Sequence, residues 1–75
     1  MNKFINVSIE SMILSVIDDI NGKEIDIDKL DNMTGFIEEI TDTINYWLME
    51  YDHQLTMDLI KDCIISVSEN SNILI

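Results

Sequence analysis

Histidine and cysteine often serve as bases, nucleophiles or metal ligands near neutral pH. They occur once each in this chain, as His53 and Cys63. His53 follows Asp52 in a predicted turn, and a catalytic His–Asp pair also needs a nucleophile held beside it. The serines are scattered over predicted helix surfaces, and Cys63 falls on an apolar stripe where a thiol packs as a small apolar side chain. We therefore predict no catalytic residue and a protein that is not an enzyme.

Three aspartates, Asp26, Asp28 and Asp31, lie close enough to Gly22 to suggest a calcium loop. An EF-hand loop places acidic ligands at fixed positions around a glycine and closes with a glutamate. No such spacing can be drawn through Gly22, and a single cysteine excludes a multi-cysteine zinc site. We expect no metal and no cofactor.

The most distinctive polar pattern lies between residues 38 and 50. At about 100° per residue, carboxylates there share one side of a helix with an aromatic residue and a methionine. These candidate partner-binding residues are Glu38, Glu39, Asp42, Tyr46, Met49 and Glu50. An aromatic anchor among carboxylates suits a partner rich in lysine and arginine, and a ridge of carboxylates can imitate a row of phosphates. The alternative is an ordinary solvated face, since isolated exposed apolar residues are common.

The charge of the chain limits its partners. Fifteen acidic residues oppose four lysines and no arginine, which gives a net charge of -11 in 75 residues. Direct binding of nucleic acid requires the opposite sign, and an anionic membrane surface would repel the chain. The expected partner is therefore a basic protein.

The apolar residues show no membrane or secretion signal. No stretch approaches the roughly 18 consecutive apolar residues of a membrane span. The apolar run after Lys3 is interrupted by Asn6, Ser8 and Glu10, and no small-residue cleavage site follows it. We expect a cytoplasmic protein, located in the host cytoplasm if a phage encodes it.

The acidic pattern belongs to a predicted helix of residues 28–51. Its apolar residues fall within an arc of roughly 120°: Leu30, Met33, Phe36, Ile37, Ile40, Ile44, Trp47, Leu48 and Tyr51. Asp28 is the predicted N-cap, with Asp31 as the acid of a capping box. Gly35 should cost about 1 kcal/mol relative to alanine. An alternative places a break near Asn32–Thr34, with Thr34 capping a shorter helix.

Two further helices are predicted on either side. Residues 2–21 repeat isoleucine, valine and methionine at helical spacing, and Asn21–Gly22 ends that helix with glycine just past the cap. Residues 55–69 form the third helix, capped by Thr56. Residues 23–27 alternate like a strand that could pair only with residues 72–75. We favour instead an extended connector that tucks Ile25 and Ile27 under the helices.

The sequence thus predicts an all-α fold: one domain of residues 1–75, formed by three helices as an antiparallel bundle or as two long helices closed by a shorter third. Several apolar residues lack an obvious place in one small core, so we expect a homodimer. The predicted self-association residues are Val7, Leu14, Ile65, Ile73, Leu74 and Ile75.

These observations favour a small binding module that inhibits or regulates a basic, nucleic-acid-handling protein. Phage-encoded inhibitors such as anti-CRISPR proteins and DNA mimics share this general character of small size, negative charge and no catalytic site, although no motif here indicates a family. One alternative is an antitoxin or immunity protein that neutralises a basic toxin. Another is a structural or assembly subunit that works through homo-oligomerisation.

Overall fold

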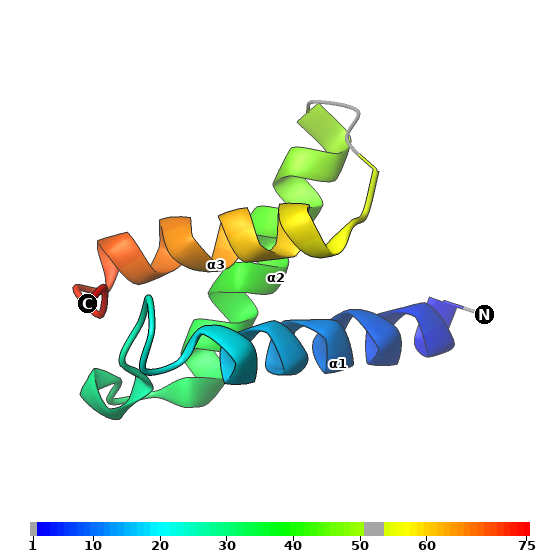
Figure 1. Cartoon of the computed structure of the whole chain (residues 1–75). Helices are drawn as coiled ribbons and strands as arrows, with labels where there is room; N and C mark the ends of the chain where they lie inside the picture. The colour runs from blue at the N-terminus through cyan, green and yellow to red at the C-terminus, as the bar shows by residue number, and fades with distance from the viewer. Residues whose placement is uncertain (1, 51–53) are drawn as a thin grey trace.

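Three helices account for most of the chain in the computed structural model (Figure 1). The structure describes the backbone of residues 2–50 and 54–75 and the side chains of residues 9–50 and 54–75. The helices are α1 (Asn2–Ile20), α2 (Met33–Glu50) and α3 (Met57–Asn70), and a short 3-10 turn, η1 (Ile27–Lys29), precedes α2. No strand occurs within the described ranges, so the predicted all-α fold with three helices is confirmed.

The helices pack against one another in all three pairs. In Figure 1, α3 lies along α1 and runs in the same direction, and α2 crosses behind both at a steep angle. The radius of gyration is 11.9 Å, close to the value of about 11 Å expected for a compact domain of this length.

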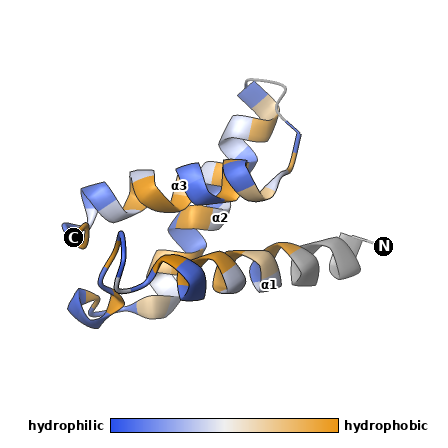
Figure 2. Ribbon diagram, viewed as in Figure 1, coloured by the Kyte–Doolittle hydropathy of each residue, from blue (hydrophilic) through white to orange (hydrophobic). Residues whose placement is uncertain are grey.

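The core is built almost entirely from branched aliphatic side chains. Apolar residues lie on the side of α1 that faces α3 (Figure 2). Among the largest fully buried side chains, the isoleucines come from all three helices, from the connector between α1 and α2 and from the segment after α3: Ile13, Ile25, Ile40, Ile44, Ile60, Ile64 and Ile73. The others are Cys63 and Ser68, and the buried Ser68 hydroxyl has no hydrogen-bond partner among the described residues.

The end of α1 follows the prediction closely. Gly22 has a φ of 83°, the left-handed conformation that glycine adopts without a steric penalty. The backbone N–H of Gly22 donates to the carbonyl of Ile25 at 2.7 Å, and the N–H groups of Lys23 and Glu24 donate to the carbonyl of Ile20. This turn directs the chain back under the helices and buries Ile25 completely.

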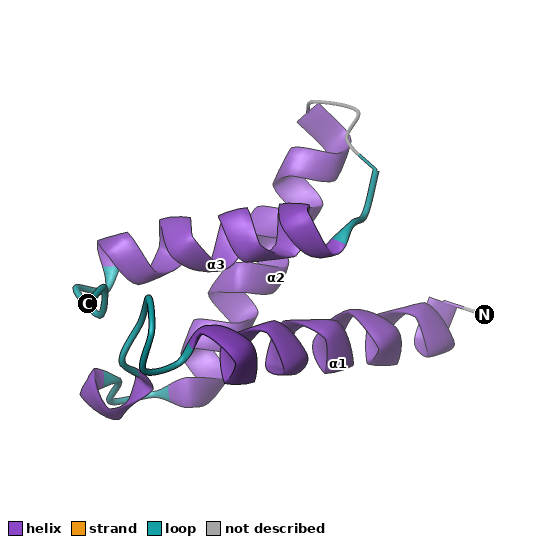
Figure 3. Cartoon of the chain, in the orientation of Figure 1, coloured by secondary structure: helices purple, strands orange, loops and turns teal. Residues whose placement is uncertain are grey.

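The connector between α1 and α2 also holds the end of the described chain (Figure 3). The Asp26 N–H donates to the Ile73 carbonyl at 2.8 Å, and the Ile75 N–H donates to the Glu24 carbonyl at 3.0 Å. These bonds flank an isolated antiparallel bridge between Ile25 and Leu74. The connector interpretation holds, since Ile25 is buried and no strand forms. The pairing with residues 72–75, which we ranked second, is nevertheless present as this single bridge.

Candidate protein-binding surface

The start of α2 differs from the prediction. The helix begins at Met33, so the predicted start at Asp28 is wrong, and so is the predicted capping box. The Asp28 N–H instead donates to the Asp26 side chain at 3.1 Å, where Asp26 caps η1. The alternative break near Asn32–Thr34 is correct in position, but Asn32 provides the cap. Its Oδ1 accepts the Gly35 N–H at 3.1 Å.

Gly35 has a specific place in this cap. A Cβ at Gly35 would lie 2.8 Å from Nδ2 of Asn32 and 3.2 Å from its Cγ. Glycine therefore leaves room for the capping amide, at the cost of some helix propensity. The cap fixes the first turn of α2.

The inner side of α2 sets the rotation of the helix. Phe36, Ile40 and Ile44 are buried, with exposed fractions of 3% or less, and Trp47 and Leu48 pack partly buried against the same core. With this stripe turned inward, residues about 180° away must face solvent.

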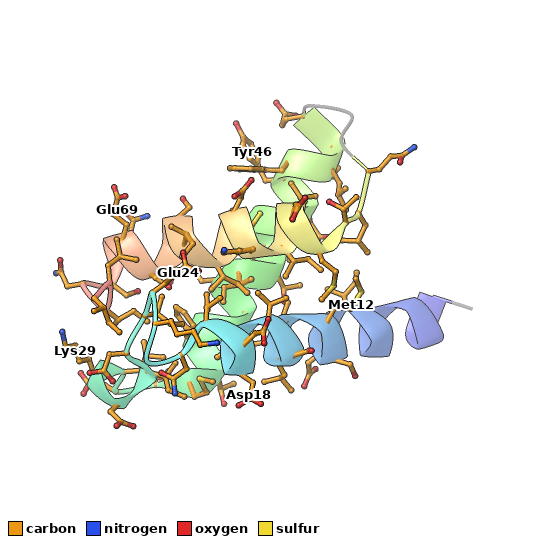
Figure 4. The ribbon with its side chains drawn as sticks, in the orientation of Figure 1. Met12, Asp18, Glu24, Lys29, Tyr46 and Glu69 are labelled. Atoms are coloured by element: carbon orange, nitrogen blue, oxygen red, sulfur yellow. The ribbon has the colours of Figure 1, made fainter. Side chains whose placement is uncertain are left out.

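The six predicted partner-binding residues all lie on the solvent side. We call them the acidic α2 face: Glu38, Glu39, Asp42, Tyr46, Met49 and Glu50, all of which are exposed. Tyr46 is 54% exposed and Met49 is 82% exposed, so both present apolar area between carboxylates. Figure 4 shows Tyr46 near the end of α2 that extends beyond α1. Asn45 is exposed on the same side. Its uncharged amide adds neither the negative charge nor the apolar area on which the sequence prediction rests.

No intramolecular cation neutralises the acidic α2 face within the described part of the chain. The ion pair found there joins Lys61 Nζ to Glu24 Oε2 at 2.9 Å, linking α3 to the connector. The hydrogen bond and the negative charge of Glu24 raise the pKa of Lys61. The face is therefore a concentration of negative charge that the described lysines do not neutralise.

The groups that could do other chemistry offer no competing site among the described residues. Cys63 is fully buried, as predicted, and burial together with the nearby Asp62 carboxylate raises the pKa of its thiol to about 11. Such a thiol is a poor nucleophile at neutral pH. No group of three or more histidine, cysteine or acidic side chains is arranged to hold a metal ion in the described ranges. His53 and Asp52 lie outside them.

The predicted self-association residues that the structure describes differ in their exposure. Ile73 is only 1% exposed and belongs to the core of its own chain, so the expectation that it needs cover from a second copy is wrong. Ile65 is half-buried against the same core. Leu14, Leu74 and Ile75 are exposed, whereas the side chain of Val7 lies outside the described residues.

Comparison with known proteins adds no further constraint. No protein-family model, curated protein or solved structure matches this chain. Among the described residues, no helix is both long and apolar enough to cross a membrane.

Proposed function

We propose that this protein is a small acidic binding module that inhibits or regulates a basic protein through the acidic α2 face. One observation carries the proposal: on a single helix, exposed carboxylates that have no ion pair with a described cation surround an exposed tyrosine and methionine. Two large side chains that share one helix side with four carboxylates give the face both the apolar contact and the charge that a basic partner would use.

The two kinds of residue have different parts in binding. The carboxylates attract a positively charged partner and speed its association, with a strong dependence on salt. Tyr46 and Met49 supply the apolar contact, since aromatic side chains are frequent energetic centres of interfaces and methionine adapts its shape to a partner. Asp42 follows Glu38 by four residues and Glu39 by three, so its Cβ lies about 5–6 Å from that of each on the helix surface. This row of negative charge suits a surface that normally binds phosphates.

The favoured class of partner is therefore a nucleic-acid-handling protein, and inhibition would follow from occupation of its nucleic-acid site. A phage-type inhibitor, such as an anti-CRISPR protein or DNA mimic, fits this description. An antitoxin or immunity protein would use the same face against a basic toxin.

A homodimer remains a prediction with less support than the binding face. Leu14, Leu74 and Ile75 are the exposed apolar residues available for it, since Ile73 is buried within its own chain. A net charge of -11 on each copy also opposes close pairing at low salt.

The first test is an affinity capture from nuclease-treated lysate with a variant carrying Glu38→Lys, Asp42→Lys and Tyr46→Ala. The matched control carries Asp62→Lys and Glu69→Lys, which reverses two exposed carboxylates on α3 and gives the same change in charge. Circular dichroism first checks that both variants are folded.

We expect the wild type and the α3 control to capture the same basic protein and the α2 variant to lose it. The purified partner should then lose nucleic-acid binding or activity when the wild-type protein is added. Equal capture by all three proteins would refute the proposal. So would equal loss from both variants, because total charge rather than the α2 face would then govern binding.

A further inference from the structure

A second surface lies between α1 and the connector, away from the acidic α2 face. An open groove of about 520 Å³ runs between Ser11, Leu14, Ser15 and Asp18 of α1 and the side chains of Ile27 and Met33. We propose that this groove binds an amphipathic basic segment of a partner protein, with a large apolar side chain in the groove and a lysine or arginine beside it.

The walls of the groove are apolar. Leu14 is 42% exposed, while Ile27 and Met33 are half-buried and pack on the core with their inner sides. Ile17, at 2% exposure, closes the inner end of the groove. The volume falls within the range of about 300–1,000 Å³ typical of binding clefts, and the open side admits a chain segment instead of enclosing a small molecule. An apolar side chain placed here would cover Leu14 from water.

The charges around the groove determine the kind of segment. Asp18 is the acidic residue of the lining and is exposed, and the exposed Asp28 and Asp31 lie in the chain between the lining residues Ile27 and Met33. The connector also carries two exposed lysines, Lys23 and Lys29, and Figure 4 places Lys29 at the outer end, away from Asp18. A segment carrying lysine or arginine next to its apolar residue would therefore find carboxylates beside the groove.

The same charges disfavour a second copy as the occupant. A symmetric pair formed through this groove would bring Asp18 of both copies to one interface, between molecules that each carry a net charge of -11. Like charges at an interface oppose association, whereas a basic segment is attracted to it.

The groove and the acidic α2 face lie on different sides of the molecule. In Figure 4, Tyr46 is at one edge of the molecule and Asp18 at the opposite edge. One protein could therefore hold two basic segments at once, from one partner or from two. This inference does not depend on the acidic α2 face being functional.

The test uses a blocked helical peptide with leucines four residues apart and lysines on its other side. The control peptide keeps every lysine and replaces the leucines by glutamine. Each is titrated into ¹⁵N-labelled full-length protein, and amide chemical shifts are followed by NMR. Two protein variants change exposed positions of the groove, one by Leu14→Ser and the other by Asp18→Lys. A third protein, used for comparison, carries both Glu38→Lys and Asp42→Lys.

We expect the leucine peptide to shift the amides of Leu14, Ser15, Ile27 and Met33. Affinity should fall about tenfold for the glutamine peptide or for Leu14→Ser, the loss expected when one large apolar contact is removed. The affinity for the leucine peptide should also fall for Asp18→Lys. It should hardly change for the variant that carries Glu38→Lys and Asp42→Lys.

Three results would overturn the inference. One is equal binding of the two peptides, which would show only general attraction to an acidic protein. Another is a shift pattern confined to α2. The third is a shift of the groove amides when the protein alone is concentrated, which would identify a second copy as the occupant. Loss of capture by the α2 variant in the first experiment tests the proposed function separately.

Discussion

The connector of residues 21–32 and the acidic α2 face have similar acidic compositions but use their polar groups in opposite ways. In the connector, the Asn21 side chain accepts the Ile27 N–H at 3.1 Å, and Asp26 accepts that of Asp28. Glu24 pairs with Lys61 at 2.9 Å. On the acidic α2 face, in contrast, no described cation lies within ion-pair distance of a carboxylate.

This difference shows that local backbone geometry, more than residue type, decides what a carboxylate does. The non-helical connector has free N–H groups within reach of short side chains, whereas the middle of a helix has none, because each N–H already bonds to a carbonyl four residues earlier. Carboxylates on the outer side of α2 are therefore left for solvent or a partner. The described polar groups of the connector thus hold the fold together, whereas the carboxylates of the acidic α2 face make no described ion pair.

The largest expected effect comes from breaking the connector at its buried residue. Ile25→Ala should reduce the free energy of unfolding by about 2–5 kcal/mol, because it leaves a cavity at a fully buried position. Asp42→Ala, on the face, should change it by less than about 0.5 kcal/mol. Urea unfolding followed by circular dichroism measures both. Should Ile25→Ala not fold, Ile25→Val should still cost about 0.5–1.5 kcal/mol. Equal effects of Ile25→Val and Asp42→Ala would contradict the comparison.

A second test uses the pH dependence of stability that the buried Cys63 thiol of α3 should cause. The pKa of the buried Cys63 thiol is about 11, whereas the ordinary value is 9.0. Between these values the unfolded chain loses the thiol proton and the folded chain keeps it, so the free energy of unfolding should fall as pH rises from about 9 to 11.

The control for this pH test is Cys63→Ala, which should show a smaller fall over the same range. Any fall that remains in the control reports other groups, such as Lys61, whose raised pKa also makes the ion pair weaken at high pH. Identical pH profiles for the two proteins would show that the thiol is not protected by burial.

The cap of α2 provides a third test, with an effect near 1 kcal/mol. Asn32→Ala should cost about 0.5–2 kcal/mol by removing the acceptor for the Gly35 N–H. Gly35→Ala alone should be nearly neutral, since about 1 kcal/mol gained in helix propensity is offset by displacement of the Asn32 amide. In the Asn32→Ala background, the same change should stabilise by about 1 kcal/mol. A double-mutant cycle of unfolding free energies that gives no coupling would refute this account.

The smallest expected effect is at the ion pair. Lys61 and Glu24 are both nearly half exposed, so Glu24→Gln should cost only about 0.2–1 kcal/mol, and less at high salt. Glu38→Gln should leave stability unchanged or raise it slightly, because it relieves repulsion from neighbouring carboxylates. Thermal unfolding at low and high salt compares the two. If both variants lower the unfolding temperature at low salt, the proposed difference between the connector and the acidic α2 face is wrong.

The sequence predicts best those features that depend on periodicity. The buried side of each helix repeats every three to four residues, so the rotation of α2 and the exposure of Tyr46 and Met49 follow from the pattern. The Thr56 cap was likewise confirmed, with its hydroxyl accepting the Leu59 N–H at 3.1 Å. The predicted start of α2 is wrong because Leu30 lies three residues before Met33, the spacing of one helix side, and also packs on the core. Leu30 nevertheless lies outside the helix.

Features that join distant residues could not be predicted from one stretch of sequence. Ile73 is buried because the backbone of residues 73–75 pairs with that of residues 24–26, a contact that local spacing cannot reveal. The groove beside Leu14 is formed by residues 11–18 and 27–33 only after the connector folds back on α1. From the sequence, Gly35 only lowers the helix propensity of α2. That the Asn32 side chain occupies the space where a Cβ at Gly35 would lie follows from geometry alone.

The dominance of isoleucine in the core has a consequence for how the chain folds. Branching at Cβ restricts the side chain in a helix and lowers the tendency of an isolated segment to be helical. At 14 residues, α3 is also near the lower length limit of about 12–15 residues for helices that persist alone in water. Each helix thus depends on contact with the other two. Peptides of α1 or α3 alone should be largely unstructured, and the intact chain should gain its helicity and its core in one cooperative step.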